Sequence, residues 1–455
     1  MKKNNETEKE TGQVKKKRFK TGLPVYNPHA AGIDVGDGKH DVAISDDAGG
    51  HHVREYQSFT EDIEQLVKWL VSEGITTVAM ESTGVYWLNL YLMLEEAGIE
   101  PYLVNAKHVK NVTGRKRDDT DAIWLQKLHS CGLLQKSFQP EGQIRVLRTY
   151  VRQRKNLITI ASDSVRRMQK ALELMNIKLH VVISDILGKT GLLMVKAILD
   201  GERDPRQLLH LKDPRIKASD EVVLKSLKGI WKEEYLFMLQ QAYDGYTFYQ
   251  TQIKACEEKI KEQLLAQAAT ILEGDVSELD ITIKKKPKKN QLFFDARPML
   301  KVIAGVDLCE VEGISEISTL ELLSEIGTDM SKWKSSKHFA AWLNVAPNTK
   351  VTGGKIISSK MQRKKNHAGQ TLRMSGSTLS TAKSPLGDYA RKMKGRLGKK
   401  GGVVATAHKL ARIIYTMLKE KRAYDKDLVA QSHQEWKEKR IKYLEKQLEQ
   451  LKKAA

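Results

Sequence analysis

Short apolar segments near the start of the chain alternate with polar turns in the manner of β-strands. Residues 30–36 (AAGIDVG) form an apolar run that ends in a glycine turn, 40–45 (HDVAIS) alternates strictly, and a third run lies near 52–58. A two-residue period, with a Gly-rich segment between the last two runs, predicts three strands joined as hairpins.

Beyond residue 60 the apolar positions fall three and four residues apart, and helices are expected to alternate with further strands. Helical stripes lie at 60–70, 86–97 and about 118–131, and apolar strand-like runs lie at 76–81 and 101–105. Hairpin strands followed by alternating helix and strand predict an α/β domain, a mixed sheet with helices on its faces.

The pattern then changes to long helices. Between about 145 and 275 the helical period persists with many charges, which predicts a helical hairpin or coiled-coil spacer. We expect six segments: a disordered basic arm (1–28), an α/β domain (29–145), a helical or coiled-coil domain (146–280), a lysine-rich linker (281–296), a mainly α C-terminal domain (297–425) and a C-terminal helix (426–455).

The net charge is concentrated in three places. The 455 residues carry 77 Lys and Arg against 56 Asp and Glu, a formal charge of +21. Residues 1–20 carry +5, 281–290 carry +5 and 351–402 carry +12, so the remainder is near neutral. Confined basic segments on a near-neutral protein indicate a polyanionic partner, and they disfavour both a structural fibre and an enzyme for acidic substrates.

The compartment is expected to be the cytoplasm. No apolar run approaches the roughly 18–20 residues of a membrane span, and no apolar segment follows the basic N-terminus as it would in a secretory signal. The three cysteines lie far apart and fit neither a disulfide framework nor a zinc site.

Four acidic residues stand at positions where a carboxylate is unusual, or where two carboxylates have a helical spacing. Asp34 interrupts an apolar strand, Glu81 ends another, and Asp118 and Asp121 are spaced to share one face of a helix start. Together they would offer the hard oxygen ligands that Mg²⁺ or Mn²⁺ prefers, and such ions assist phosphodiester displacement.

Each acid also has an ordinary interpretation. A strand-end aspartate is often a turn former, and acids near a helix start can simply complement the helix dipole. A neighbouring basic run favours the functional alternative, because a backbone-binding strip beside a metal–carboxylate cluster suits phosphodiester chemistry. The run consists of Lys107, Lys110, Arg115, Lys116 and Arg117.

Several motifs carry a resemblance to a known family. The segments GIDVG, MESTGVYW and NAKHVKNVTGRKRDDTDAIWLQKL resemble the DEDD transposases of the RNA-guided insertion-sequence family, the bridge-RNA recombinases, and 298–420 is similar to their C-terminal domain. The resemblance implies an RNase H-like fold of the Holliday-junction-resolvase type for the first domain. It also implies that Asp34, Glu81, Asp118 and Asp121 are the metal-binding acids, with Mg²⁺ or Mn²⁺ as cofactor.

The family's serine nucleophile corresponds here to Thr352, in APNTKVTGGK. Threonine has the needed hydroxyl, although its β-branch crowds the attack. Three alternatives remain open: Thr352 is a working substitute, Ser358 or Ser359 has taken over, or strand transfer is lost. In a purely structural interpretation, Thr352 only caps the Gly353–Gly354 turn.

The segment that follows Thr352 is predicted to contact nucleic acid, because it combines many cations with Gly, Ser and Thr. Its candidate contacts are Lys355, Lys360, Arg363, Lys364, Lys365 and Arg373.

The resemblance further implies a homodimer or homotetramer in a bacterial or archaeal cytosol, acting on donor and target DNA with a structured noncoding guide RNA. The implied reaction is metal-assisted cutting and rejoining through a covalent protein–DNA intermediate. Two alternatives are a structure-selective nuclease that uses water on the same carboxylates, and a nucleic-acid-binding module whose catalysis has decayed.

Overall fold

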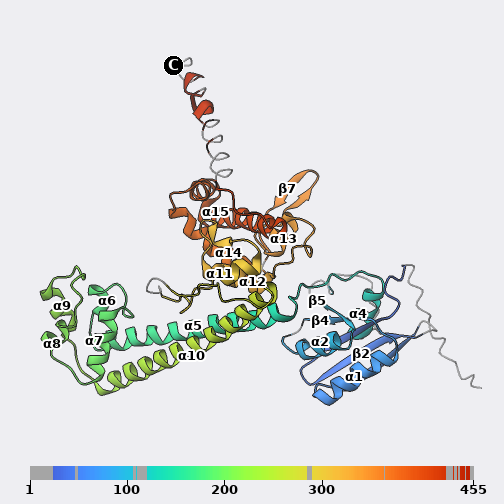
Figure 1. Cartoon of the computed structure of the whole chain (residues 1–455), viewed down its shortest axis with the longest axis horizontal. Helices are drawn as coiled ribbons and strands as arrows, with labels where there is room; N and C mark the ends of the chain where they lie inside the picture. The colour runs from blue at the N-terminus through green and yellow to red at the C-terminus, as the bar shows by residue number, and fades with distance from the viewer. Residues whose placement is uncertain are drawn as a thin grey trace, which may run out of the picture. The chain divides into compact units, whose positions relative to one another are not determined.

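The protein is described from a computed structural model, in which two compact units follow one another along the chain (Figure 1): Met1–Gln139, unit 1, and Pro140–Ala455, unit 2. The described residues are 24–46, 50–82, 84–105, 109, 120–283, 289–362, 364–426, 434, 438, 441–445 and 447–450.

Unit 1 is built on a five-stranded sheet with the strand order β3-β2-β1-β4-β5. The first three strands pair antiparallel as successive hairpins, and β1, β4 and β5 run parallel. The strands are β1 (Ala30–Val35), β2 (Lys39–Ser45), β3 (His51–Gln57), β4 (Thr77–Glu81) and β5 (Glu100–Val104).

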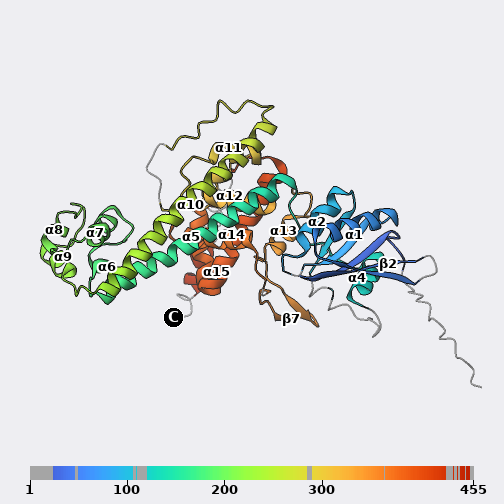
Figure 2. The same ribbon diagram turned by 90° about the horizontal axis from the view of Figure 1, so that it is seen from below.

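Helices cover both faces of this sheet (Figure 2). On one face, α1 (Thr60–Ser72) and α2 (Trp87–Glu96) bury a core that includes Ile33 and Met80. On the other face, α4 (Asp121–Ser130) packs over Ala79 and Val104. Because neighbouring residues of a strand point to opposite faces, the continuous apolar runs of β1 and β4 predict this double burial. The predicted mixed sheet is confirmed, and the unit is an RNase H-like α/β domain.

The predicted disordered arm 1–28 needs a correction at its end. Residues 1–23 lie outside the described part, but the backbone N–H groups of Tyr26 and Asn27 donate to the Ser130 carbonyl at 2.8 and 3.0 Å. The last carbonyls of α4 have no partner within the helix, and this segment satisfies one of them.

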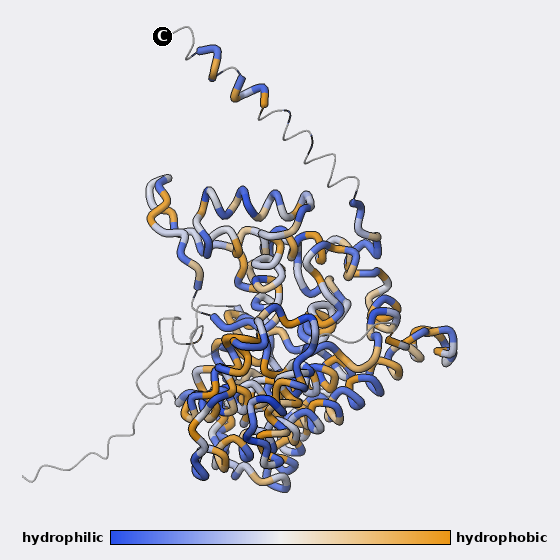
Figure 3. The backbone as a smooth tube through the Cα atoms, turned by 90° about the vertical axis from the view of Figure 1, so that its left-hand side faces the viewer, coloured by the Kyte–Doolittle hydropathy of each residue, from blue (hydrophilic) through white to orange (hydrophobic). Residues whose placement is uncertain are grey.

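Unit 2 begins with two long antiparallel helices, α5 (Gly142–Leu174) and α10 (Glu233–Ile271). Their pairing is marked by Gln267, which donates to the Gln143 carbonyl, and by a buried ion pair of 2.7 Å between Arg154 and Glu257. Apolar and hydrophilic stretches alternate along the chain (Figure 3), as they must in helices with one buried stripe. The predicted helical hairpin is confirmed.

Four short helices between α5 and α10 form a cap with its own core, which residue periodicity alone did not predict. Met194, Val195 and Leu227 are fully buried there against the end of α5. The helices are α6 (Leu179–Val182), α7 (Lys189–Leu199), α8 (Pro205–Leu209) and α9 (Asp220–Leu227).

The linker predicted at 281–296 is only partly a linker. Residues 284–288 lie outside the described part, but Leu292 and Phe294 are buried. Arg154 donates to the Asn290 carbonyl at 2.8 Å, so this segment is fastened to the α5–α10 pair.

The rest of unit 2 is mainly helical, with one small hairpin. Phe339 and Trp333 form its aromatic core with Tyr415, whose hydroxyl donates to the Trp333 carbonyl. The elements are α11 (Arg297–Ala304), η1 (Leu308–Glu310), α12 (Glu316–Ile326), α13 (Ser336–Trp342), β6 (Lys350–Thr352), β7 (Lys355–Ser358), α14 (His367–Thr378), η2 (Leu379–Thr381) and α15 (Pro385–Glu420).

The element α15 is two helices that fold back on each other. Gly398 breaks the helix with φ 75° and ψ 172°, a conformation that glycine adopts without steric cost. A Cβ at Gly402 would lie 2.6 Å from the Lys394 backbone, and in one straight helix these residues would be about 12 Å apart. The two arms of α15 therefore pack with backbones in close contact.

Only fragments of the predicted C-terminal helix 426–455 are described. Residues 441–445 are helical, and Ile441, Leu444 and Leu448 are exposed. In the described ranges, no helix is long and apolar enough to cross a membrane.

Candidate active site

Two of the four predicted acids lie on neighbouring strands of unit 1. β1 and β4 pair in parallel, with Ile33 opposite Met80, so the next residues, Asp34 and Glu81, stand side by side at the ends of the two strands. Ile33 and Met80 belong to the core under α1 and α2, so Asp34 and Glu81 point to the other face, which α4 covers. Both are half-buried.

The third acid approaches the same edge from the helix above. A Cβ at Gly32 would lie 2.3 Å from the Ala122 carbonyl oxygen, so α4 crosses β1 with backbones almost touching. The Gln126 side chain donates to the Ala30 carbonyl, so α4 runs opposite to β1. Asp121, the first residue of α4, is therefore at the Asp34 end of the strand, with its side chain exposed.

The fourth acid and the basic strip fall in one segment of the chain, between β5 and α4. Asp118 lies outside the described residues, as do Lys107, Lys110, Arg115, Lys116 and Arg117. The described helix starts at Asp121, after Thr120 accepts the Ile123 N–H as its cap. That Asp118 and Asp121 share one face at a helix start stays a prediction.

A further acid beside Asp34 was not predicted. Asp41 of β2 is the direct cross-strand partner of Asp34, and Glu55 of β3 is in turn the partner of Asp41. Lys39 forms ion pairs with both, at 3.9 Å to Asp41 and 2.5 Å to Glu55. The hydrogen bond to Glu55 and the charge of Asp41 raise the pKa of Lys39. The alternation of HDVAIS, paired with GIDVG, was the signal that could have identified Asp41.

The end of α4 away from the carboxylate edge carries a neutral buried histidine. Thr77 donates its hydroxyl to the Glu100 carbonyl at 3.0 Å, so it accepts the hydrogen bond of 2.9 Å from His129 Nε2. Burial lowers the pKa of His129 to about 4. His129 therefore stays uncharged at neutral pH and fastens α4 to β4.

The donor set fits a hard divalent cation in chemistry and backbone placement. Asp34, Glu81 and Asp121 supply only carboxylate oxygens, the ligands that Mg²⁺ and Mn²⁺ prefer. Among the side chains that the structure describes, no three His, Cys, Asp or Glu residues converge closely enough to hold a metal ion.

The predicted nucleophile lies in unit 2, at the tip of the β6–β7 hairpin. Thr352 ends β6 and pairs with Lys355 of β7 across a two-residue turn. Gly353 and Gly354 have φ of 56° and 73°, as a type I′ turn requires. Thr352 is exposed, and so are Val351, Ile356 and Ile357 around it.

The two alternative serines differ from Thr352 in their surroundings. Ser358 is half-buried at the end of β7, and its hydroxyl accepts the Lys360 backbone N–H at 3.3 Å. Ser359 follows outside the strand and is exposed. Thr352 has the more open position of the two hydroxyls on the hairpin strands.

Most of the predicted nucleic-acid contacts of unit 2 are exposed cations. Lys355, Lys360, Lys364 and Lys365 are exposed, and no described carboxylate forms an ion pair with them. Arg363 lies outside the described residues.

Arg373 differs from these lysines because it supports the fold. It is half-buried, donates to the Asn344 carbonyl, and has its pKa lowered by burial. Asn344 in turn donates to the Gln362 and Lys364 carbonyls and fastens the segment after the hairpin. Contact of Arg373 with nucleic acid stays a prediction.

Comparison with protein families assigns this architecture. A DEDD transposase model of the IS110 type, described as a transposase, matches residues 31–177. A second model, described as the transposase IS116/IS110/IS902 family, matches residues 307–388. The chain belongs to the IS110 family of transposases. None of the curated proteins compared with it matches.

The two family matches of this IS110-family transposase include both parts of the candidate site. The first match includes Asp34, Glu81 and Asp121, and the second includes the β6–β7 hairpin with Thr352. The predicted recognition is thereby confirmed: the protein is an enzyme of DNA recombination from an insertion sequence, and DNA is its substrate.

Proposed function

We propose that this transposase is an RNA-guided DNA recombinase that cuts and rejoins donor and target DNA through a covalent protein–DNA intermediate. The observation that supports it most is the parallel pairing of β1 and β4, which sets Asp34 beside Glu81 on the α4 face. Half-buried carboxylates on adjacent strand ends, with a third at the start of α4, form an oxygen-donor set suited to phosphodiester chemistry.

Asp34, Glu81, Asp118 and Asp121 would hold Mg²⁺ or Mn²⁺. A bound divalent ion polarises the scissile phosphate and stabilises the charge that develops on its oxygens. The fixed register of β1 against β4 keeps Asp34 and Glu81 in place, and the close packing of α4 on Gly32 orients Asp121.

The Thr352 hydroxyl is the nucleophile in this proposal. Its Oγ1 bonds to phosphorus while one P–O bond of the DNA strand breaks. The Thr352 proton passes to water, and the departing oxygen takes up a proton from water and leaves as a hydroxyl. A hydroxyl from a strand of the second duplex then attacks the same phosphorus, and Thr352 is released as the new phosphodiester forms. No external energy source is needed, because a phosphoester bond is conserved throughout.

The exposed lysines of the hairpin and the segment after it would hold nucleic-acid backbone. Lys355, Lys360, Lys364 and Lys365 have no carboxylate partner among the described residues, so they are available to phosphates. A structured guide RNA would select the sequence by base pairing while the protein contacts shape and charge. Because the carboxylates and Thr352 belong to different units, a homodimer or homotetramer can combine them from different copies.

The test uses suicide DNA substrates, nicked so that a released end diffuses away and religation is prevented. Protein, Mg²⁺ and the structured RNA encoded beside the gene are incubated with labelled DNA. Denaturing gels then detect protein–DNA adducts, and mass spectrometry maps the attachment residue. We expect an adduct at Thr352 that is lost in Thr352→Ala and in Asp34→Asn and retained in Thr352→Ser.

Other outcomes separate the parts of the proposal. An adduct that maps to Ser358 or Ser359 contradicts Thr352 as the nucleophile. Cleavage that survives in Thr352→Ala without any adduct identifies a nuclease that uses water. Activity that is unchanged when the RNA is omitted contradicts RNA guidance.

A further inference from the structure

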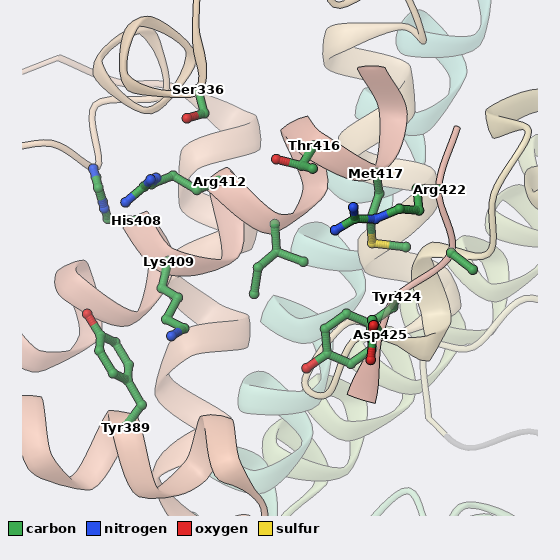
Figure 4. Close-up of a pocket in the computed structure, with 12 residues that line it drawn as sticks. Ser336, Tyr389, His408, Lys409, Arg412, Thr416, Met417, Arg422, Tyr424 and Asp425 are labelled. Carbon is green, nitrogen blue, oxygen red and sulfur yellow. The ribbon is translucent and has the colours of Figure 1, made fainter. Parts of the chain in front are cut away.

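A basic cavity lies on the C-terminal arm of α15, and all of its lining residues except Ser336 lie beyond the residues matched by either family model. It has a volume of about 440 Å³, within the range of small-ligand sites. Figure 4 shows Lys409, Arg412 and Arg422 around it, with Tyr389 on one side and Tyr424 on the other. All lining residues belong to unit 2.

The charges of this cavity are unbalanced. Its lining has three basic side chains, Lys409, Arg412 and Arg422, and one carboxylate, Asp425. Lys409 and Arg412 form no ion pair with any described carboxylate, and the contact of Arg422 with Glu420 is long, at 3.8 Å between exposed groups. An anionic ligand would neutralise the excess.

Lys409 is the least solvated of these cations. It is half-buried on a helix, and its ammonium stands 4.8 Å from the centre of the Tyr389 ring. Burial, together with the neighbouring Arg412 charge, lowers the pKa of Lys409. Partial desolvation of the Lys409 ammonium costs free energy in the empty protein, and such groups are enriched at sites where a ligand compensates them.

The remaining walls suit a nucleoside more than a bare anion. Ile413, Met417 and Tyr424 give an apolar side, and Thr416 and Ser336 bring hydroxyls that can donate to phosphate oxygens. Bases bind such surfaces by stacking and apolar contact, without sequence preference.

The same folded helix presents a path that leads to the cavity. Around the bend at Gly398, exposed cations without a described carboxylate partner are Lys394, Arg396, Lys399 and Lys400. From Gly398 to Lys409 the helix rises about 16 Å, or about five base steps of a nucleic-acid strand. A strand held at the bend can therefore reach the cavity.

We propose that this cavity takes one nucleotide of a single-stranded nucleic-acid segment, its phosphate on Lys409 and Arg412 and its base against the apolar wall. Its lining includes neither the candidate carboxylates nor Thr352. The site does not depend on RNA guidance or on the covalent mechanism. Binding is therefore measured without metal, in EDTA, so that a failure of cleavage chemistry leaves this measurement unaffected.

The probe is a fluorescein-labelled twelve-residue oligothymidylate, titrated with the full-length protein by fluorescence anisotropy at several salt concentrations. We expect Lys409→Met/Arg412→Gln to weaken binding at least tenfold and to reduce the slope of log affinity against log salt by about one per lost phosphate contact. The matched control, Arg206→Gln/Lys217→Met, removes one Arg and one Lys from exposed positions near α8. It should change binding less than twofold.

A second variant separates insertion into the cavity from surface attraction. Thr416→Phe keeps every charge and fills the cavity. If a nucleotide enters the cavity, Thr416→Phe should lower the affinity for the oligonucleotide at least fivefold. Lys409→Arg keeps the positive charge and should retain most of the affinity. Unchanged affinity in Thr416→Phe, or equal losses in the pocket and control doubles, overturns the proposal. Circular dichroism and thermal unfolding verify that each variant is folded.

Two further arms identify the source of the phosphate. An oligouridylate of the same length should bind within about tenfold of the DNA strand, and the fully paired duplex should bind more weakly than either. Thymidine monophosphate that binds the wild type as tightly as the oligonucleotide, in a Lys409-dependent way, would identify a free-nucleotide site and contradict the strand proposal.

Discussion

The carboxylate edge of unit 1 and the Thr352 hairpin of unit 2 are built in opposite ways. Asp34 and Glu81 are half-buried, fixed by strand pairing on both sides and covered by a helix whose backbone touches β1. Thr352 is exposed on a hairpin held by a few hydrogen bonds, with apolar neighbours open to solvent. Metal ligands need fixed geometry, and a nucleophile that enters another site must be exposed and able to extend into it. The first region should therefore tolerate few substitutions, and the second should tolerate many.

The largest expected effect is at the rigid edge. Asp34→Asn keeps the shape of the side chain and removes its charge, so strand transfer should fall by more than about 1,000-fold while stability is unchanged. Asp37→Asn, an exposed acid in the β1–β2 turn, is the control and should stay within about twofold. Suicide-substrate cleavage and thermal unfolding measure the two quantities. Loss of stability in Asp34→Asn would mean that the carboxylate is structural.

The second effect concerns pH. His129 has a folded pKa of about 4 against 6.5 for the free residue, so the unfolded chain takes up the proton first as pH falls. Its contribution to stability is complete above about pH 6.5 and is lost towards pH 4, by about 3 kcal/mol in total. Urea unfolding of wild type and His129→Gln at pH 7.5 and 4.5 measures it. The variant should lose less stability on acidification; parallel losses would contradict a buried neutral His129.

The third effect is on packing. At Gly32 a methyl group would overlap the Ala122 carbonyl oxygen and the Gln126 nitrogen, both backbone atoms, so α4 must move. Gly32→Ala should destabilise unit 1 by about 1–3 kcal/mol and reduce cleavage. The control is Gly38→Ala, where a Cβ meets nothing within 4 Å. Differential scanning calorimetry measures the stability of both variants. Equal stabilities of Gly32→Ala and Gly38→Ala would contradict the prediction.

The smallest effect is expected at the hairpin. Thr352→Ser removes the β-branch and keeps the hydroxyl, so adduct formation should rise by a few-fold or stay unchanged, with no change in stability. The rate of adduct formation on suicide substrates measures this effect. The control is Ser358→Ala, which should leave that rate unchanged. A Thr352→Ser variant with activity reduced a hundredfold would show that the methyl group positions the hydroxyl and that this region is as rigid as the first.

Much of the fold could be predicted because local pattern and burial coincide. GIDVG and TTVAME are apolar on both faces, as strands covered by helices on each side must be, so the sheet and its acids were recognisable. Asp41 was missed because its position beside Asp34 is set by the register of two strands, and single-strand periodicity does not carry that information.

The cavity on α15 could not be predicted for a similar reason. Tyr389 and Lys409 are twenty residues apart in what resembles one basic, glycine-containing stretch, and they meet only because the helix reverses at Gly398. The small helices α6–α9 were also missed. The helices α6, α8 and α9 span only 4, 5 and 8 residues, too few for a clear helical period. Their burial depends on the end of α5, which lies far from several of them in sequence.

The long helix α5 limits how segments of the chain can be exchanged between relatives. The compact units divide after Gln139, yet the first family match continues to residue 177 and includes all of α5. Its partner α10 lies between the two matches, so Arg154 belongs to the shared module and Glu257 does not. A chimera that takes the matched module from a relative would pack the α5 helix of that relative against the α10 helix of this protein. Such exchanges succeed only where the buried charge of one helix finds its counterpart on the other.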